Sequence, residues 1–257
     1  MTPRILIIAG SDSGGGAGIQ ADIKTATMLG GHAMTAITAL TAQNTLGVTG
    51  VMPVPAAFVI QQMDAVISDI GVDAVKIGMI GSPETAHAVA DRLEQLAVPI
   101  VFDPVMVATS GSALADEATI AAFGRLMRLA SVTTPNIPEL EALGGEAAVL
   151  AHGCHLLAKG GHAEGPEVVD RLIAPNGPIR ELRGKRFDTD DTHGTGCTLA
   201  SALATGLGRG FPIEKAFEQA VSFVRISILE APGLGGGNGP LGQQYATDFQ
   251  WGERDHD

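Results

Sequence analysis

The sequence is poor in basic residues, aromatic residues and cysteine, and each shortage argues against a class of protein. Its 16 Lys and Arg residues stand against 28 Asp and Glu, which gives a formal net charge of −12. Nonspecific nucleic-acid binding needs a basic surface, so no nucleic-acid partner is expected. One Trp, one Tyr and eight Phe are too few for a base-stacking platform. Two cysteines cannot form a disulfide scaffold and indicate a reducing compartment, which predicts a cytoplasmic protein.

Long apolar segments that could anchor the chain in a membrane are also missing. The apolar run at residues 5–9 is too short for a signal peptide and leads directly into a glycine-rich turn. Residues 25–63 carry no charged side chain, but polar residues and two prolines interrupt them repeatedly. A buried region explains this stretch better than a spanning helix, so no membrane partner is expected.

The pattern that is present alternates short apolar runs with helical segments. Strands are predicted at residues 5–9, 33–40, 74–77, 100–102, 131–133, 154–158 and 167–173. Helices are predicted at 18–28, 56–70, 83–96, 116–129, 138–143, 195–207 and 213–229. This order is typical of an α/β protein with a mostly parallel sheet and helices on both faces.

Domain organisation follows from the absence of any linker or repeat, which predicts a single domain over residues 1–257. The turn residues at 175–178 predict a hairpin near the sheet edge. The glycine-rich stretch 233–242 is interpreted as a flexible connection to a loose C-terminal tail from about residue 233. The alternative is a loop that closes near a ligand.

The motif DTHGTGC at residues 191–197 precedes an alanine-rich helix. Its glycines allow a tight turn, and the helix leaves its first N–H groups unpaired with a partial positive charge. Together these features favour an anion pocket suited to phosphoryl transfer. An ordinary loop-to-helix turn is the alternative.

Cys197 closes this motif, where a helix terminus is expected to lower the pKa of its thiol. Three roles stay open: a covalent nucleophile with His193 as base, a base or hydrogen-bond donor in the anion pocket, or a packed small residue.

A second glycine-rich loop, GSDSGGGAG at residues 10–18, lies between the first strand and the first helix. Ligands of α/β folds bind at such strand ends. The loop is neither a dinucleotide fingerprint, since no acidic residue closes a second strand, nor a P-loop, since no Gly-Lys-Ser/Thr follows. Substrate contact and a purely structural turn are equally compatible with it.

Polar residues follow three further predicted strands. Asp103, Asn136 and Glu139 carry the oxygen ligands that Mg²⁺ prefers, although each alone could cap a helix or turn. Lys159, followed by two glycines, could reach a phosphate or could be an exposed lysine at a turn.

Taken in order, these motifs resemble the hydroxymethylpyrimidine/phosphomethylpyrimidine kinases of thiamin biosynthesis, in the ribokinase-like superfamily. The resemblance runs from residue 5 to about residue 230 and rests on AGSD at 9–12, GGAGIQAD at 15–22, TALTAQN at 38–44, KIGM at 76–79, DPVM at 103–106, TPNIPE at 134–139, KGGH at 159–162 and HGTGC at 193–197. It implies a ribokinase-like three-layer α/β/α fold. It also implies an ATP- and Mg²⁺-dependent kinase that phosphorylates 4-amino-5-hydroxymethyl-2-methylpyrimidine and then its monophosphate, and it suggests a homodimer.

The resemblance also implies site residues. The pyrimidine would be bound by Gly10, Ala17, Asp22, Gln43, Met79 and Val105. Metal would be held by Asp103 and Glu139, and the nucleotide would be contacted by Asn136, Lys159 and Thr192. The catalytic group would comprise Lys159, Gly194, Thr195, Gly196 and Cys197, with the backbone of residues 194–197 as the anion hole. Many relatives in the superfamily carry Asp where this chain has Cys197, which favours the pyrimidine branch over sugar kinases.

Two alternatives stay open: a pyridoxal or pyridoxine kinase of the same superfamily, and a non-catalytic ligand-binding relative. Two features depart from the family pattern. The segment between Glu139 and Lys159 is shorter than expected by most of one helix, and the pair Asp190-Asp191 makes the approach to the anion loop unusually acidic.

Overall fold

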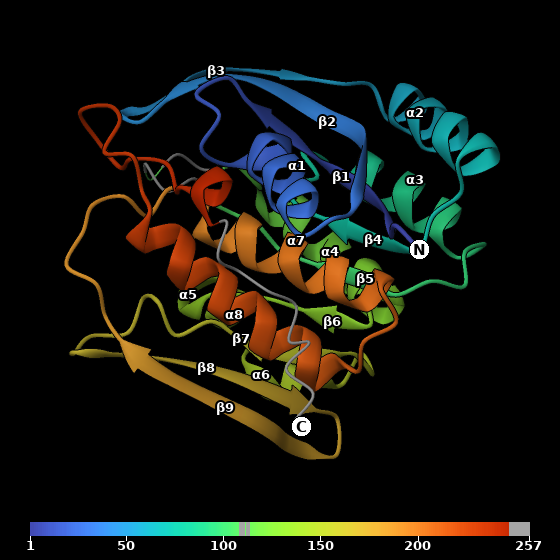
Figure 1. Cartoon of the computed structure of the whole chain (residues 1–257). Helices are drawn as coiled ribbons and strands as arrows, with labels where there is room; N and C mark the ends of the chain where they lie inside the picture. Colours follow the sequence, from blue (N-terminus) through green and yellow to red (C-terminus); the bar gives the residue numbers. More distant parts are fainter. Residues whose placement is uncertain (108–110, 112–113, 247–257) are drawn as a thin grey trace.

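A nine-stranded sheet forms the frame of the computed structural model, which describes residues 1–246 apart from 108–110 and 112–113 (Figure 1). The strand order is β3-β2-β1-β4-β5-β6-β7-β8-β9. The central strands of this order, β2, β1, β4, β5, β6 and β7, run parallel. The strand β3 at one edge and the strands β8 and β9 at the other edge pair antiparallel. The strands are β1 (Arg4–Asp12), β2 (His32–Asn44), β3 (Gly47–Pro53), β4 (Ala74–Ile77), β5 (Ile100–Phe102), β6 (Val132–Thr133), β7 (His155–Ala158), β8 (Glu167–Ala174) and β9 (Gly177–Lys185).

Helices cover both faces of this sheet, which confirms the predicted α/β architecture. They are α1 (Gly18–Met28), α2 (Ala56–Asp69), α3 (Pro83–Leu93), α4 (Glu117–Leu129), α5 (Ile137–Ala142), α6 (Glu146–Leu150), α7 (Thr195–Gly208) and α8 (Ile213–Leu229), with a 3₁₀ turn, η1 (Gln243–Tyr245). Figure 1 shows α1, α7 and α8 together in front of the sheet.

Two hydrophobic cores follow from the alternation of side chains along the central strands. On β1, Leu6 and Ile8 face the core beneath α2, α3 and α4. Ile5 and Ile7 face the core beneath α1, α7 and α8. All four are completely buried, so β1 is covered on both faces, as its continuous apolar run predicts.

Helix starts agree with the signals in the sequence. Ser82 caps α3 by accepting a hydrogen bond from the Thr85 N–H at 3.1 Å, and Pro83 occupies the first turn. Asp116 caps α4 in the same way through the Thr119 N–H at 2.8 Å. The hairpin at 175–178 is also confirmed, because β8 and β9 pair there at the sheet edge.

The structure differs from the predicted elements in two places. β2 continues to Asn44 and pairs with an unpredicted strand, β3, so the uncharged stretch 25–63 contains an edge hairpin rather than a single buried strand. The short segment after Glu139 still forms a helix, α6, of five residues. Gly144 and Gly145, both with positive φ near 90°, make the turn between α5 and α6.

Residues 237–246 pack against the domain instead of forming the predicted loose tail. The Asn238 N–H donates to the Thr45 carbonyl at 3.1 Å, and the Gly242 N–H donates to the Ser227 carbonyl at 2.8 Å. Leu241 is completely buried, and the buried Gln243 amide donates to Thr198 Oγ1 at 3.0 Å. The segment therefore joins the β2–β3 hairpin to α7 and α8; residues 247–257 lie outside the described part of the chain.

This packing predicts that Leu241→Ala lowers the free energy of unfolding by about 2–5 kcal/mol, because it leaves a cavity in the core. Leu234→Ala is the matched control, since Leu234 in the glycine-rich stretch 233–242 is 59% exposed, and its effect should stay within about 0.5 kcal/mol. Urea unfolding measures both. Equal, small effects would restore the loose-tail interpretation.

Candidate active site

The polar residues predicted at strand ends meet at one edge of the sheet. Asp103 and Thr134 directly extend β5 and β6, with the Asp103 N–H donating to the Ile77 carbonyl and the Thr134 N–H to the Phe102 carbonyl. Lys159 follows β7, and its N–H donates to the Pro135 carbonyl at 3.1 Å. The carboxyl ends of parallel strands thus assemble a group of side chains from distant parts of the sequence.

Lys159 lies between two carboxylates in this group. Its Nζ is 2.7 Å from Asp103 Oδ1 and 3.7 Å from Glu139 Oε2. Burial alone would lower the pKa of Lys159, but the charges of Asp103 and Glu139 outweigh it and raise that pKa. Burial also raises the pKa of Glu139. Thr134 Oγ1 donates to Asp103 at 3.0 Å and fixes the carboxylate's orientation.

The N-terminus of α7 faces the same ion pair. Gly194 adopts the left-handed conformation, φ 89°, just before the helix begins, and a Cβ there would collide with the Gly16 carbonyl. A Cβ on Gly196 would lie 3.1 Å from Lys159 Nζ and 3.7 Å from Asp103 Oδ2. The first turn of α7, whose partial charge is positive, therefore lies directly beside a lysine and a carboxylate.

Cys197 lies partly buried in this turn, and its thiol differs from the expectation. Burial raises its pKa to about 11, and the Asp22 and Asp103 carboxylates act in the same direction, against Lys76. Desolvation and two nearby negative charges thus raise the pKa of this thiol, where the start of a helix was expected to lower it. The thiol is protonated at neutral pH, so it can donate a hydrogen bond but does not start as a base or a thiolate nucleophile.

Asp22, which was expected to contact the substrate, lies beneath the site rather than at its surface. It is completely buried on α1, and its two oxygens lie 2.8 and 2.9 Å from Nζ of Lys76, which is also completely buried. Ser201 Oγ on α7 donates to the same carboxylate at 2.7 Å. Asp22 thus counters the charge of a buried lysine on β4, and the three residues fasten α1 and α7 to the sheet.

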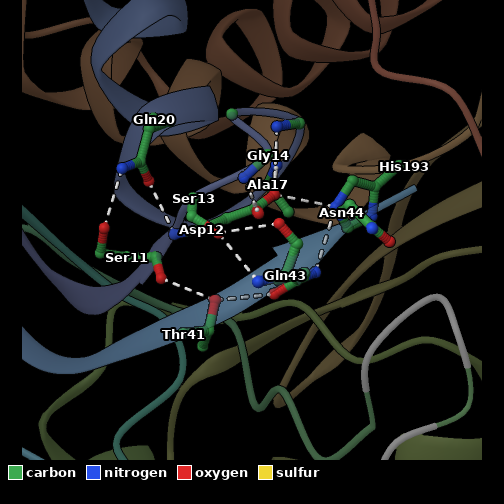
Figure 2. A network of polar contacts seen from close by, with 12 residues as sticks. Ser11, Asp12, Ser13, Gly14, Ala17, Gln20, Thr41, Gln43, Asn44 and His193 are labelled. Atoms are coloured by element: carbon green, nitrogen blue, oxygen red, sulfur yellow. Dashed lines mark hydrogen bonds and ion pairs between the residues drawn. The ribbon is translucent and has the colours of Figure 1, made fainter. Parts of the chain in front are cut away.

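A contact that the sequence did not reveal joins Asp12, His193 and Gln43 (Figure 2). Asp12 accepts hydrogen bonds from the N–H groups of Gly14, Gly16 and Ala17 at 2.8–3.0 Å, and its Oδ2 lies 2.9 Å from His193 Nε2. Burial would raise the pKa of Asp12, but these hydrogen bonds lower it. The two glycine-rich loops are therefore tied together by one carboxylate. The only sequence signal was that both residues lie inside glycine motifs.

The other residues expected to bind the heterocycle lie at the ends of β1, β2, β4 and β5 and just before α1. Gly10 and Met79 are adjacent, since a Cβ on Gly10 would lie 3.0 Å from Met79 Sδ. Ala17 precedes α1 and is held by Asp12. Val105 follows Asp103 and is partly exposed. Gln43, at the end of β2, lies 3.2 Å from His193.

The remaining nucleotide and metal candidates have local partners. Asn136 and Glu139 form a capping box on α5, in which each side chain accepts the other residue's backbone N–H at 2.8–2.9 Å. The helix-capping role that the sequence allowed for these residues is therefore present in the structure. The Thr192 carbonyl accepts the Thr195 N–H at 3.3 Å. Within residues 1–246, gaps excepted, no group of three or more His, Cys, Asp or Glu side chains is placed to hold a metal ion.

The comparison with solved structures defines the class of this fold. Pyridoxal kinase of Bacillus subtilis, solved as an ADP complex, superposes with a TM-score of 0.87 at 30% identity, covering 95% of this chain and 98% of that one. The protein therefore has the ribokinase-like fold that the resemblance implied, with its site at the strand ends.

Sequence comparisons define the family. Residues 12–242 match the phosphomethylpyrimidine kinase model. The chain is 46% identical over 258 residues to hydroxymethylpyrimidine/phosphomethylpyrimidine kinase of Rhizobium meliloti, covering 94% of this chain and 97% of that protein. It is 42% identical over 256 residues to thiamine biosynthesis multifunctional protein ThiED of Corynebacterium efficiens, covering 93% of this chain but 35% of that protein. The chain belongs to the phosphomethylpyrimidine kinase family, and it spans about a third of the length of this multifunctional relative.

Among the described helices, none combines the length and apolar character needed to cross a membrane.

The raised pKa of Cys197 predicts its reactivity. In a Cys154→Ser variant, where Cys197 is the one remaining thiol, the rate of iodoacetamide alkylation should rise about tenfold per pH unit from pH 7 to 10, because only the thiolate reacts. The same variant unfolded in urea should level off near the ordinary thiol pKa of about 8.5. A plateau of the folded protein's rate below pH 9 would contradict the assignment.

The Asp22–Lys76 pair predicts an asymmetry between single and double variants. Asp22→Asn leaves the Lys76 charge buried without a counter-charge and should cost about 3–5 kcal/mol of folding free energy. Replacing both residues, in Asp22→Leu with Lys76→Met, removes the unpaired charge and should cost less. Urea unfolding of both proteins tests this, and a double variant less stable than the single one would show that the pair is not what makes Asp22 necessary.

Proposed function

We propose that this protein is an ATP-dependent kinase that phosphorylates 4-amino-5-hydroxymethyl-2-methylpyrimidine and then its monophosphate, giving the diphosphate for thiamin biosynthesis. Membership of the phosphomethylpyrimidine kinase family supports the reaction class. The observation that carries the proposal is the first turn of α7 beside the Lys159–Asp103 pair, since phosphoryl transfer needs charge neutralisation and alignment more than covalent chemistry.

In this proposal the phosphoryl group passes over the backbone of residues 194–197. The N–H groups of that turn would stabilise the charge on the transferred phosphate, and Lys159 would neutralise it from the opposite side. The protonated thiol of Cys197 would add a hydrogen bond. Thr192 and Asn136 would border the nucleotide, and the heterocycle would lie against Gly10, Ala17, Met79 and Val105.

Magnesium fits the donor set of this site. Asp103 accepts hydrogen bonds from Lys159 and Thr134 through Oδ1, which leaves its Oδ2 for a cation. Glu139 adds a second carboxylate beside it, with hydrogen bonds from the Asn136 and Met106 N–H groups. Mg²⁺ is usually held by one or two carboxylates together with substrate phosphates and water. Asp103 and Glu139 would hold the ion, which would neutralise phosphate charge when bound.

The pyridoxal kinase alternative has weaker support. The chain is 46% identical to the Rhizobium meliloti pyrimidine kinase but 30% identical to the Bacillus subtilis pyridoxal kinase. The alternative of a non-catalytic relative is opposed by the presence of Asp103, Glu139, Lys159 and the glycine turn of α7 in one site.

A coupled ATP assay with each heterocycle in turn separates these functions. Turnover of the hydroxymethylpyrimidine and its monophosphate, with little turnover of pyridoxal, supports the proposal. Preference for pyridoxal would favour the alternative kinase, and no turnover of any heterocycle at saturating ATP and Mg²⁺ would favour a binding protein.

Lys159→Ala should lower kcat by roughly 10²–10³, because it removes one group that stabilises the transferred phosphate. Gly196→Pro should lower kcat at least as much, because it removes an N–H and also places a Cβ 3.1 Å from Lys159 Nζ. Proline lacks the N–H but is tolerated in the first turn of a helix, so Gly196→Pro should stay folded. Lys185→Ala, an exposed lysine on β9, is the control with unchanged kcat. Near-normal activity in both site variants, with folding verified by circular dichroism, would defeat the phosphate role of this turn.

We also propose a cytoplasmic homodimer. The two cysteines are free in the structure, which suits a reducing compartment.

Apolar side chains gather on the edge hairpin, where Val51 and Met52 on β3 and Leu46 in the turn are exposed. Such a patch on an edge strand suits burial against a second copy. Sedimentation equilibrium that gives a monomer at micromolar concentration would overturn the dimer.

A further inference from the structure

The Thr41 hydroxyl faces two hydrogen-bond acceptors, one of them the Gln43 side chain. The Thr41 hydroxyl has one proton, yet its Oγ1 lies 2.9 Å from the Ser11 carbonyl oxygen and 3.1 Å from Gln43 Oε1 (Figure 2). Both neighbours are acceptors, and one proton cannot serve both fully. The Ser11 carbonyl is the closer of the two, so the proton points there and the hydroxyl offers Gln43 a lone pair.

A second conflict lies at the other end of the same amide. His193 Nε2 is 2.9 Å from Asp12 Oδ2 and 3.2 Å from Gln43 Nε2. Asp12 already accepts three backbone N–H groups, which hold it as a carboxylate, so His193 must present an N–H to it. The Gln43 NH₂ group then faces another N–H, where an oxygen is required.

One rotation of the amide removes the conflict at Thr41 and replaces the N–H to N–H contact at His193 by a three-centre hydrogen bond, in which the Nε2 proton is shared between Asp12 and the Gln43 oxygen. The rotation is allowed because the two ends of a side-chain amide are told apart only by the hydrogen bonds they make. We propose that Thr41 and His193 are positioning residues that hold the Gln43 amide with its nitrogen toward Thr41 and its oxygen toward His193. Asp12 completes the device by fixing the proton on His193 Nε2.

This orientation decides what Gln43 can offer a ligand. One N–H is used by Thr41 and one oxygen lone pair by His193, which leaves one donor and one acceptor side by side. An aminopyrimidine edge carries the complementary pair, a ring nitrogen that accepts and an amino group that donates. This step rests on the proposed function. It makes Thr41 and His193, through Gln43, determinants of selectivity for the amino group over an oxo group.

The test compares Thr41→Val, which keeps the shape but loses the hydroxyl, with Thr41→Ser, which keeps the hydroxyl. The kcat/KM of each variant is measured for the 4-amino substrate and for its 4-oxo analogue. We expect Thr41→Val to lose discrimination between the two by roughly tenfold or more, mainly through KM, because the amide is free to turn. Thr41→Ser should retain the wild-type ratio.

The outcomes separate this proposal from the proposed function. A wild-type protein that phosphorylates neither pyrimidine contradicts the function. An active wild-type protein whose discrimination is unchanged in Thr41→Val overturns the positioning role alone.

A second measurement needs no variant at Thr41. Long-range ¹H–¹⁵N correlation on the wild-type protein, with the His193 signal assigned by comparison with His193→Gln, reports which ring nitrogen carries the proton. A protonated Nε2 is expected, and a ring protonated only at Nδ1 would overturn the proposal even if Thr41→Val fails to fold.

Discussion

The carboxylate of Asp12 is the interaction on which the site depends. It gathers three N–H groups of the first glycine loop and holds His193 at the head of the second. Glycines make this possible, because side chains at Gly16 and Gly194 would collide with the opposite loop. Two loops about 180 residues apart in the sequence thereby pack together and form one side of the site. Gln43 at the end of β2 is bound to the same histidine.

The lysines Lys76 and Lys159 around the site are each paired with a carboxylate. Lys76 is compensated by Asp22 beneath the site, and Lys159 by Asp103 at its surface, with Glu139 nearby. Buried charges persist only when paired and hydrogen-bonded, which explains the additional bonds from Ser201 and Thr134. The same negative charges, together with burial, keep the Cys197 thiol protonated. A chain that is acidic overall thus presents a lysine and helix N–H groups where a phosphate would bind.

Much of the fold could be predicted because local patterns are strong. α1 and α8 lie where the helical pattern places them, and the Ser82 cap and the edge hairpin at 175–178 also agree. The strand β3 was not predicted because its residues are largely exposed and do not form a buried apolar run. The packing of residues 237–246 could not be predicted for a different reason. Their anchors, Thr45, Thr198 and Ser227, are distant in sequence and leave no local signal.

The sequence by itself determined which chemistry is available: two glycine-rich turns, a lysine and carboxylates after strands, and a cysteine at a helix start. Tertiary structure alone decided which partners each of these groups has. It buried Asp22 against Lys76, made Asn136 and Glu139 the cap of α5, and raised the pKa of Cys197 instead of lowering it. The physical reason is that burial and partners fix a side chain's charge and free hydrogen-bonding capacity, and both come from residues far away along the chain.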